Sequence, residues 1–144
     1  MRVVSLLPAA TEVVYALGVE PVAVSHECDY PPAAQELPAA NAVRVDSDAS
    51  SAAVNEQVAD AEATGGVYDL STDVLERADP DLVITQGVCD VCAVDGTLVR
   101  EAVEELDLDA AVVTTHPHSL DDVFADIERI GAALGREERA AALV

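Results

Sequence analysis

The side chains best suited to chemistry in this 144-residue chain are three cysteines and three histidines. Each follows a short apolar run typical of a buried strand, and none lies within a predicted helix or strand. They form three pairs along the chain: His26 with Cys28, Cys89 with Cys92, and His116 with His118. Open parallel sheets bind ligands beyond the carboxyl ends of their strands. The positions of the pairs therefore favour one shared site over loop residues with unrelated roles.

The Cys89-x-x-Cys92 pair has the spacing of a redox pair, a disulfide or half of a tetrahedral zinc site. A redox pair usually opens a helix, but the next predicted helix begins too late. An odd number of cysteines argues against a framework of disulfides alone. His26 and Cys28 would complete a zinc site if the strand before them and the strand before Cys89 were neighbours. Alternatively, the thiols are reduced and line a pocket or pack as small apolar groups.

No catalytic constellation is visible. The sequence contains no Gly-x-Ser-x-Gly nucleophile elbow, and Gly65-Gly66 follows a predicted helix instead of a strand, so it is not a phosphate loop. A hydrolase or transferase would need a base and a nucleophile that we cannot identify. We therefore expect a binding protein and not an enzyme.

The charge of the chain excludes nucleic acids and anionic lipids as partners. There are 28 Asp and Glu residues against 7 Arg and no Lys, which gives a formal net charge of -21. No apolar run approaches the ~20 residues that span a membrane. The apolar stretch before Pro8 is too short for a signal peptide. We expect a cytoplasmic protein, or an extracytoplasmic and membrane-associated one if a leader was removed before this numbering begins.

The elements that position the candidate residues alternate between strands and helices. Apolar runs predict strands at residues 3–7, 21–25, 82–85 and 110–115. Apolar spacing and end signals predict helices from Pro8 to Gly18, after Ser50 or Ser51, after Ser71, around residues 99–106, from Ser119 to Gly135, and from Arg136 onward. Residues 27–48 are predicted to be mostly loop. This order predicts an α/β fold, an open parallel sheet flanked by helices on both faces.

Three motifs resemble one known family. Residues 2–12 (RVVSLLPAATE), Val24-Ser25 followed by Asp29-Tyr30-Pro31-Pro32, and residues 79–84 (DPDLVI) look like the N-terminal lobe of the cobalamin and ferric-siderophore substrate-binding proteins of ABC importers. The resemblance spans residues 1–118 and is closest to the cobalamin-binding branch. It implies one lobe of a two-lobe protein that holds its ligand between the lobes. Residues 119–135 would then be a helix packed on this lobe, and residues 136–144 the start of the helix that links it to a missing second lobe.

The resemblance also implies roles for individual residues. Glu27 and Gln86 take places where the vitamin receptor has aromatic residues, and Asp73 takes the place of a glutamate that docks on the permease. Tyr30 or Tyr68 would supply an apolar face, although each is also consistent with a core tyrosine. The implied ligand-binding residues are Pro8, His26, Glu27, Tyr30, Tyr68 and Gln86, and the candidate metal ligands are His26, Cys28, Cys89 and Cys92.

Two functions follow from these assignments. The first is the substrate-binding component of an ABC importer for a metal chelate, either a corrinoid such as cobalamin or another one. The second is an intracellular binding protein, built on the same lobe, that senses metals or thiols.

Salt is predicted to stabilise the folded chain. The acids are spread along the whole sequence, which favours adaptation to a salt-rich interior over an ordinary acidic protein from a GC-rich genome. Repulsion among these charges is screened over about 8 Å at 0.15 M salt and about 3 Å at 1 M. The midpoint of thermal unfolding should rise between dilute buffer and molar KCl. A midpoint that stays constant over this range would contradict the salt-adaptation hypothesis.

Overall fold

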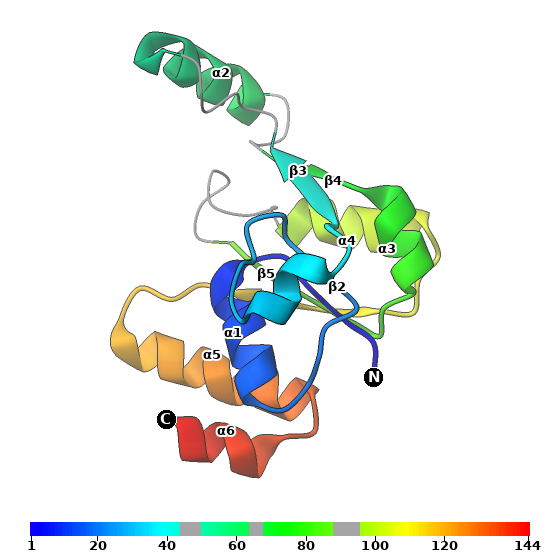
Figure 1. Ribbon diagram of the computed structural model, residues 1–144, viewed down its shortest axis with the longest axis vertical. Coiled ribbons are helices and arrows are strands. Elements are labelled where there is room, and N and C mark those ends of the chain that lie inside the picture. The colour runs from blue at the N-terminus through cyan, green and yellow to red at the C-terminus, as the bar shows by residue number, and fades with distance from the viewer. Residues whose placement is uncertain (44–49, 64–67, 88–95) are drawn as a thin grey trace.

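A four-stranded parallel sheet forms the centre of the computed structural model, which describes residues 1–43, 50–63, 68–87 and 96–144 (Figure 1). The strands lie in the order β2-β1-β5-β6. Their bounds are Val3–Ser5 (β1), Ala23–Val24 (β2), Leu82–Gln86 (β5) and Ala111–Thr115 (β6). Val4 of β1 pairs with Ala23 on one side and with Val83 on the other. The predicted open parallel sheet is confirmed.

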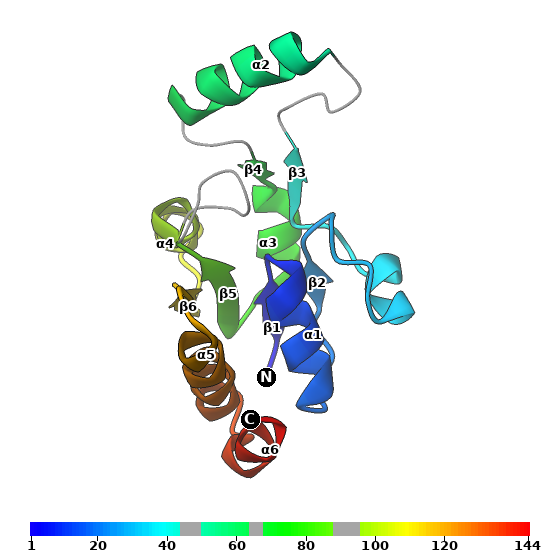
Figure 2. The same cartoon turned by 90° about the vertical axis from the view of Figure 1, so that its left-hand side faces the viewer.

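Successive residues of the central strands face two different apolar layers. Val3 and Leu82 belong to one core cluster, whereas their neighbours Val4 and Val83 belong to the other. The first cluster lies under α1 (Pro8–Ala16), α5 (Leu120–Ala133) and α6 (Glu137–Leu143), and the second under α3 (Thr72–Ala78) and α4 (Gly96–Glu105). Figure 2 shows these helices on opposite sides of the sheet, as predicted from the alternation of strands and helices. No helix in the described ranges is long and apolar enough to cross a membrane.

The serine caps predicted from the sequence are present. The hydroxyl of Ser50 accepts a hydrogen bond from the backbone N–H of Ala53 at the start of α2 (Ser51–Ala63). Ser71 accepts from Val74 at the start of α3, and Ser119 accepts from Asp122 at the start of α5. Each bond satisfies a backbone donor that has no partner within the helix, which explains why these helices begin where the sequence predicts.

A second, antiparallel sheet was not predicted. Its strands are β3 (Asn41–Val43) and β4 (Tyr68–Leu70), and the first lies in a segment that we expected to be loop. The same segment contains a short 3₁₀ helix, Pro32–Glu36. Strands of three residues carry too little periodicity to be detected, and this pairing joins segments far apart in the sequence. In both views α2 lies beyond this pair of strands, away from the parallel sheet (Figures 1 and 2).

The strand order corrects one expectation and creates a crevice. The second and third predicted strands, β2 and β5, are not neighbours, because β1 lies between them.

The chain leaves β1 through α1 on one face and leaves β5 through α4 on the other. Two adjacent strands whose connections depart in opposite directions leave an open space beyond their carboxyl ends, where parallel sheets bind ligands. In this chain that place lies between Leu7 and Gln86.

The contact between α5 and α6 provides a test of the packing. Gly131 of α5 faces the fully buried Ala140 of α6, and a Cβ added at Gly131 would overlap the Cβ of Ala140. Gly131→Ala should destabilise the fold, because overpacking costs about 1–3 kcal/mol and the gain in helix propensity is at most about 1 kcal/mol. Urea unfolding at constant KCl would measure the change.

The double variant Gly131→Ala with Ala140→Gly serves as the control. It removes the overlapping methyl group, so its destabilisation should be smaller than the sum of the two single changes. Additive effects, or a Gly131→Ala variant more stable than the parent, would contradict this close contact.

Candidate functional site

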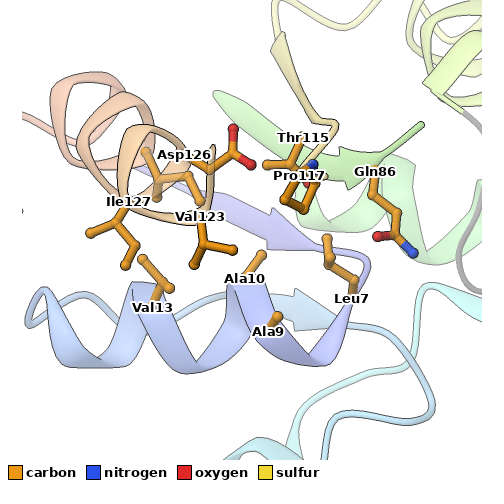
Figure 3. Close-up of a pocket in the computed structure, with 11 residues that line it drawn as sticks. Leu7, Ala9, Ala10, Val13, Gln86, Thr115, Pro117, Val123, Asp126 and Ile127 are labelled. Carbon is orange, nitrogen blue, oxygen red and sulfur yellow. The ribbon is translucent and has the colours of Figure 1, made fainter. Parts of the chain in front are cut away.

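An apolar groove lies at the carboxyl ends of the parallel strands, between α1 and α5 (Figure 3). Val123 and Ile127 of α5 point toward Ala10 and Val13 of α1. Three strand ends complete its lining through Leu7, Gln86 and Thr115. The groove measures about 110 Å³, below the ~300–1,000 Å³ of pockets that enclose a small ligand. It can therefore receive one edge of a ligand whose remainder lies outside this lobe.

His26 lies after β2 and is held by a side chain from the second sheet. Oδ1 of Asn41 accepts a hydrogen bond from the backbone N–H of His26 and lies 2.9 Å from its Nδ1. Asn41 is buried, with 4% of its surface exposed. The other ring nitrogen, Nε2, lies 3.6 Å from Oε1 of Glu27. The imidazole is thus fixed on its inner side, while 27% of its side chain stays accessible.

Cys28 lies close to His26 in sequence but in different surroundings. Only 4% of it is exposed, and its Sγ lies 3.0 Å from Oγ1 of Thr11. The same Thr11 oxygen lies 2.8 Å from Oγ of Ser5, so the contacts join β1, α1 and the loop after β2. Burial raises the pKa of the Cys28 thiol above its ordinary value of 9.0, although the bond to Thr11 opposes the shift. The structure therefore favours a protonated, packed thiol at this position.

The other predicted ligand-binding residues occupy varied positions. Pro8 is half-buried in the first turn of α1, and Gln86 ends β5 beside the groove. Tyr30 is 62% exposed in the segment after β2, which excludes the alternative of a core tyrosine at this position. Tyr68 begins β4 in the second sheet. Asp73 is exposed in the first turn of α3, where the helix dipole also favours an acid.

Four residues were predicted to bind a metal ion: His26, Cys28, Cys89 and Cys92. Cys89 and Cys92 lie outside the described residues. Within the described ranges, no group of three or more His, Cys, Asp or Glu side chains is arranged to hold a metal ion. The zinc interpretation assumed adjacent strands before the two pairs, and that assumption is wrong. Coordination by the Cys89 and Cys92 pair stays a prediction.

Sequence reasoning missed two features of this edge of the sheet. Asn41 was assigned to a loop, and only the fold brings it to His26. At the ends of β5 and β6, a Cβ on Gly87 would overlap the imidazole of His116. The glycine after β5 therefore leaves room for the histidine that follows β6. A glycine two residues beyond a predicted strand, as Gly87 is, can signal such a close approach, and it was the available clue.

The profile of the family described as periplasmic binding protein matches residues 3–144. The chain belongs to the periplasmic binding protein family. The resemblance recognised in the sequence motifs is thereby confirmed at the level of the family. No curated protein matches this chain.

Solved structures share the fold of this family member. They include the periplasmic heme-binding protein BhuT in complex with two hemes (24% identity, TM-score 0.68). Others are an ABC transporter substrate-binding protein from Listeria monocytogenes EGD-e (16%, 0.64) and the siderophore-binding protein FhuD from Vibrio cholerae bound to Fe³⁺-Desferal (16%, 0.55). Each match covers 99% of this chain but 44%, 43% and 45% of the other chains, respectively. The chain thus spans less than half the length of these proteins, and identities this low show the fold alone.

The burial of Cys28 predicts slow thiol chemistry. In a Cys89→Ser, Cys92→Ser variant, Cys28 is the single thiol and should react with a maleimide at pH 8 roughly tenfold or more slowly in the native than in the denatured chain. The pKa of the Cys28 thiol is raised in the folded protein. The stabilisation that this thiol contributes to the folded state is therefore present below about pH 9, its ordinary pKa, and is lost as the pH rises through the pKa of the folded state. Reaction of the native protein at the denatured rate would show that this thiol is accessible.

Proposed function

We propose that this chain forms the N-terminal lobe of an extracytoplasmic substrate-binding protein that delivers a metal chelate to an ABC importer. The observation that carries the proposal is the family match over residues 3–144. The shallow apolar groove at the carboxyl ends of the strands supports it, because a ligand clamped between two lobes needs only a partial surface on each. The heme and ferric-siderophore complexes among the similar structures support a metal chelate as the cargo.

The charge of the lobe favours a neutral or cationic chelate. The segments that follow the parallel strands, residues 6–8, 25–31, 87 and 116–119, contain no arginine, and Glu27 and Asp29 are exposed beside His26. A polyanionic chelate would meet repulsion from this surface and from the net charge of -21. Corrinoids such as aquacobalamin carry no such excess of negative charge, so a corrinoid is the cargo that we propose.

The buried state of Cys28 disfavours the alternative of a thiol sensor at this position. A reactive cysteine needs access and a lowered pKa, whereas burial raises the pKa of this thiol. Asp73 keeps its proposed role as a docking residue for the permease. It is exposed on α3, and a carboxylate at that position can pair with an arginine of a partner.

Equilibrium dialysis against aquacobalamin, hemin and ferric desferrioxamine in molar KCl would test the proposal. Aquacobalamin should bind the chain most tightly, and a chain extended through a second lobe should bind it far more tightly, because both faces of the ligand are then buried. Tyr30→Ala should weaken binding several-fold, because the exposed ring lies in the segment after β2.

Leu143→Ala is a matched control, since it also removes an exposed apolar side chain but from α6. Its affinity should equal that of the parent. Failure of both the chain and its extended form to bind any of the three chelates would overturn the proposed function.

A further inference from the structure

We propose that a pocket at the amino ends of β1 and β2 binds a small monocarboxylate with a short apolar body, through Arg2 and Arg77. This arginine pocket measures about 260 Å³. Because Arg2 precedes β1 and the groove is lined by Leu7 beyond it, the two lie at opposite ends of the sheet. The proposal therefore concerns a second ligand and is independent of the proposed function. The residues that line the arginine pocket are Arg2, Val22, Ala23, Pro38, Val74, Arg77 and Ala78.

The arginine pocket is positive in a chain whose net charge is -21. It brings together two of the seven arginines, and the described residues that line it include no acid. A second pair, Arg136 and Arg139, lines a surface pocket beside α6. Glu137 and Glu138 line the same pocket and offset its charge. An anion would therefore be attracted to the arginine pocket, although the chain as a whole repels anions.

Both guanidinium groups are oriented by hydrogen bonds from their Nε atoms. Nε of Arg2 donates to the carbonyl of Ala78 at 2.6 Å, and Nε of Arg77 donates to the carbonyl of Asp73 at 3.3 Å. The C-terminal end of a helix attracts cations, which explains why both side chains contact α3. The N–H groups on the Nη atoms have no acceptor among the residues that the structure describes. These donors can therefore bind a ligand without breaking a contact within the described ranges.

The two arginines are held on anchored parts of the backbone. The N–H of Arg2 donates to Oδ2 of Asp81 at 2.7 Å, and the carbonyl of Arg2 accepts from the N–H of Asp81 at 2.8 Å. Arg77 lies in the last turn of α3, which packs against β2. Both side chains are exposed at the rim of the pocket, so a ligand can reach them. Donors that are positioned before binding lose little conformational freedom on binding.

The walls of the arginine pocket determine which anion it fits. Five of its seven lining residues are apolar, and Val22 and Val74 are half-buried. Phosphate would lose hydrating water against these walls without gaining a hydrogen bond there. A carboxylate pairs with a guanidinium through two parallel hydrogen bonds, and a branched chain attached to it can cover the valines. The volume lies below the ~300–1,000 Å³ of sites for larger ligands, so a small acid such as isovalerate is the suitable probe.

NMR titration of the full chain with isovalerate, in molar KCl at neutral pH, tests the proposal. The amide signals of Val22 and Val74 should shift until the site is saturated, whereas those of Leu7 and Val123 in the groove should stay constant. Acetate lacks the branched chain and should bind several-fold more weakly. Inorganic phosphate should not displace isovalerate. Val74→Thr replaces a methyl group by a hydroxyl group, so it should weaken isovalerate binding and leave acetate binding unchanged.

Variants of the arginines test the charged end of the site. Arg77→Gln should lower the affinity for isovalerate about tenfold, because hydrogen bonds to a charged group are lost. Arg77→Lys keeps the charge without the planar pair of donors and should retain part of the affinity. Arg136→Gln is the matched control, since it removes the same charge from an exposed arginine outside the pocket, and should bind like the parent. Thermal unfolding of each variant without ligand establishes that folded proteins are compared.

Several results would overturn the proposal. Equal losses in Arg77→Gln and Arg136→Gln would show general attraction by charge and no site. Equal affinities for acetate and isovalerate, or displacement by phosphate, would contradict the role of the apolar walls. Tighter binding of N-acetylglutamate amide than of isovalerate would assign the pocket to an acidic side chain of a partner protein. Absence of saturable shifts with every carboxylate would remove the site, and none of these results depends on whether the chain binds a corrinoid.

Discussion

The burial of β1 is the constraint on which the rest of the structure depends. Val3 and Val4 are both fully buried, because this strand has a neighbour on each side and a helical layer on each face. A strand buried on both faces is expected to be a nearly continuous apolar run, and residues 3–7 are apolar except for Ser5. Its two neighbours run parallel to it, so all their carboxyl ends meet at one edge of the sheet. The location of the candidate site therefore follows from the core and does not require any feature of the loops.

This dependence explains which parts could be predicted from the sequence. The parallel strands and their helices carry their own signals, such as the apolar run before Pro8 and the cap at Ser71. The position of Asn41 carries none, because it depends on pairing between β3 and β4, whose facing residues lie far apart in the chain. The assumption that β2 and β5 are adjacent failed for a related reason. Strand order is a property of the whole sheet, and loop sequences do not encode it locally.

The second sheet is joined to the first through the segment just before β3. The N–H of Ala40 donates to the carbonyl of Val24 on β2 at 2.8 Å, and the N–H of Ser71 donates to the carbonyl of Ala40 at 2.7 Å. This segment thus runs along the edge of β2 and delivers Asn41 to His26. A segment that was expected to be loop therefore fixes the orientation of His26 at the carboxyl end of β2. Residues remote from the groove can be as necessary to a binding site as those that line it.

The acidity of the chain also limits how it can recognise a ligand. Screening shortens the range of electrostatic interactions from about 8 Å at 0.15 M salt to about 3 Å at 1 M, so at molar salt the surface charges attract or repel a ligand mainly where it touches them. Burial of apolar surface is also an interaction of short range. At the carboxyl ends of its strands the lobe presents the apolar groove between α1 and α5 and the imidazole of His26, which Asn41 orients. Screening by salt acts on charges and not on apolar surface, so the groove is the feature of this edge whose interactions depend least on the salt concentration.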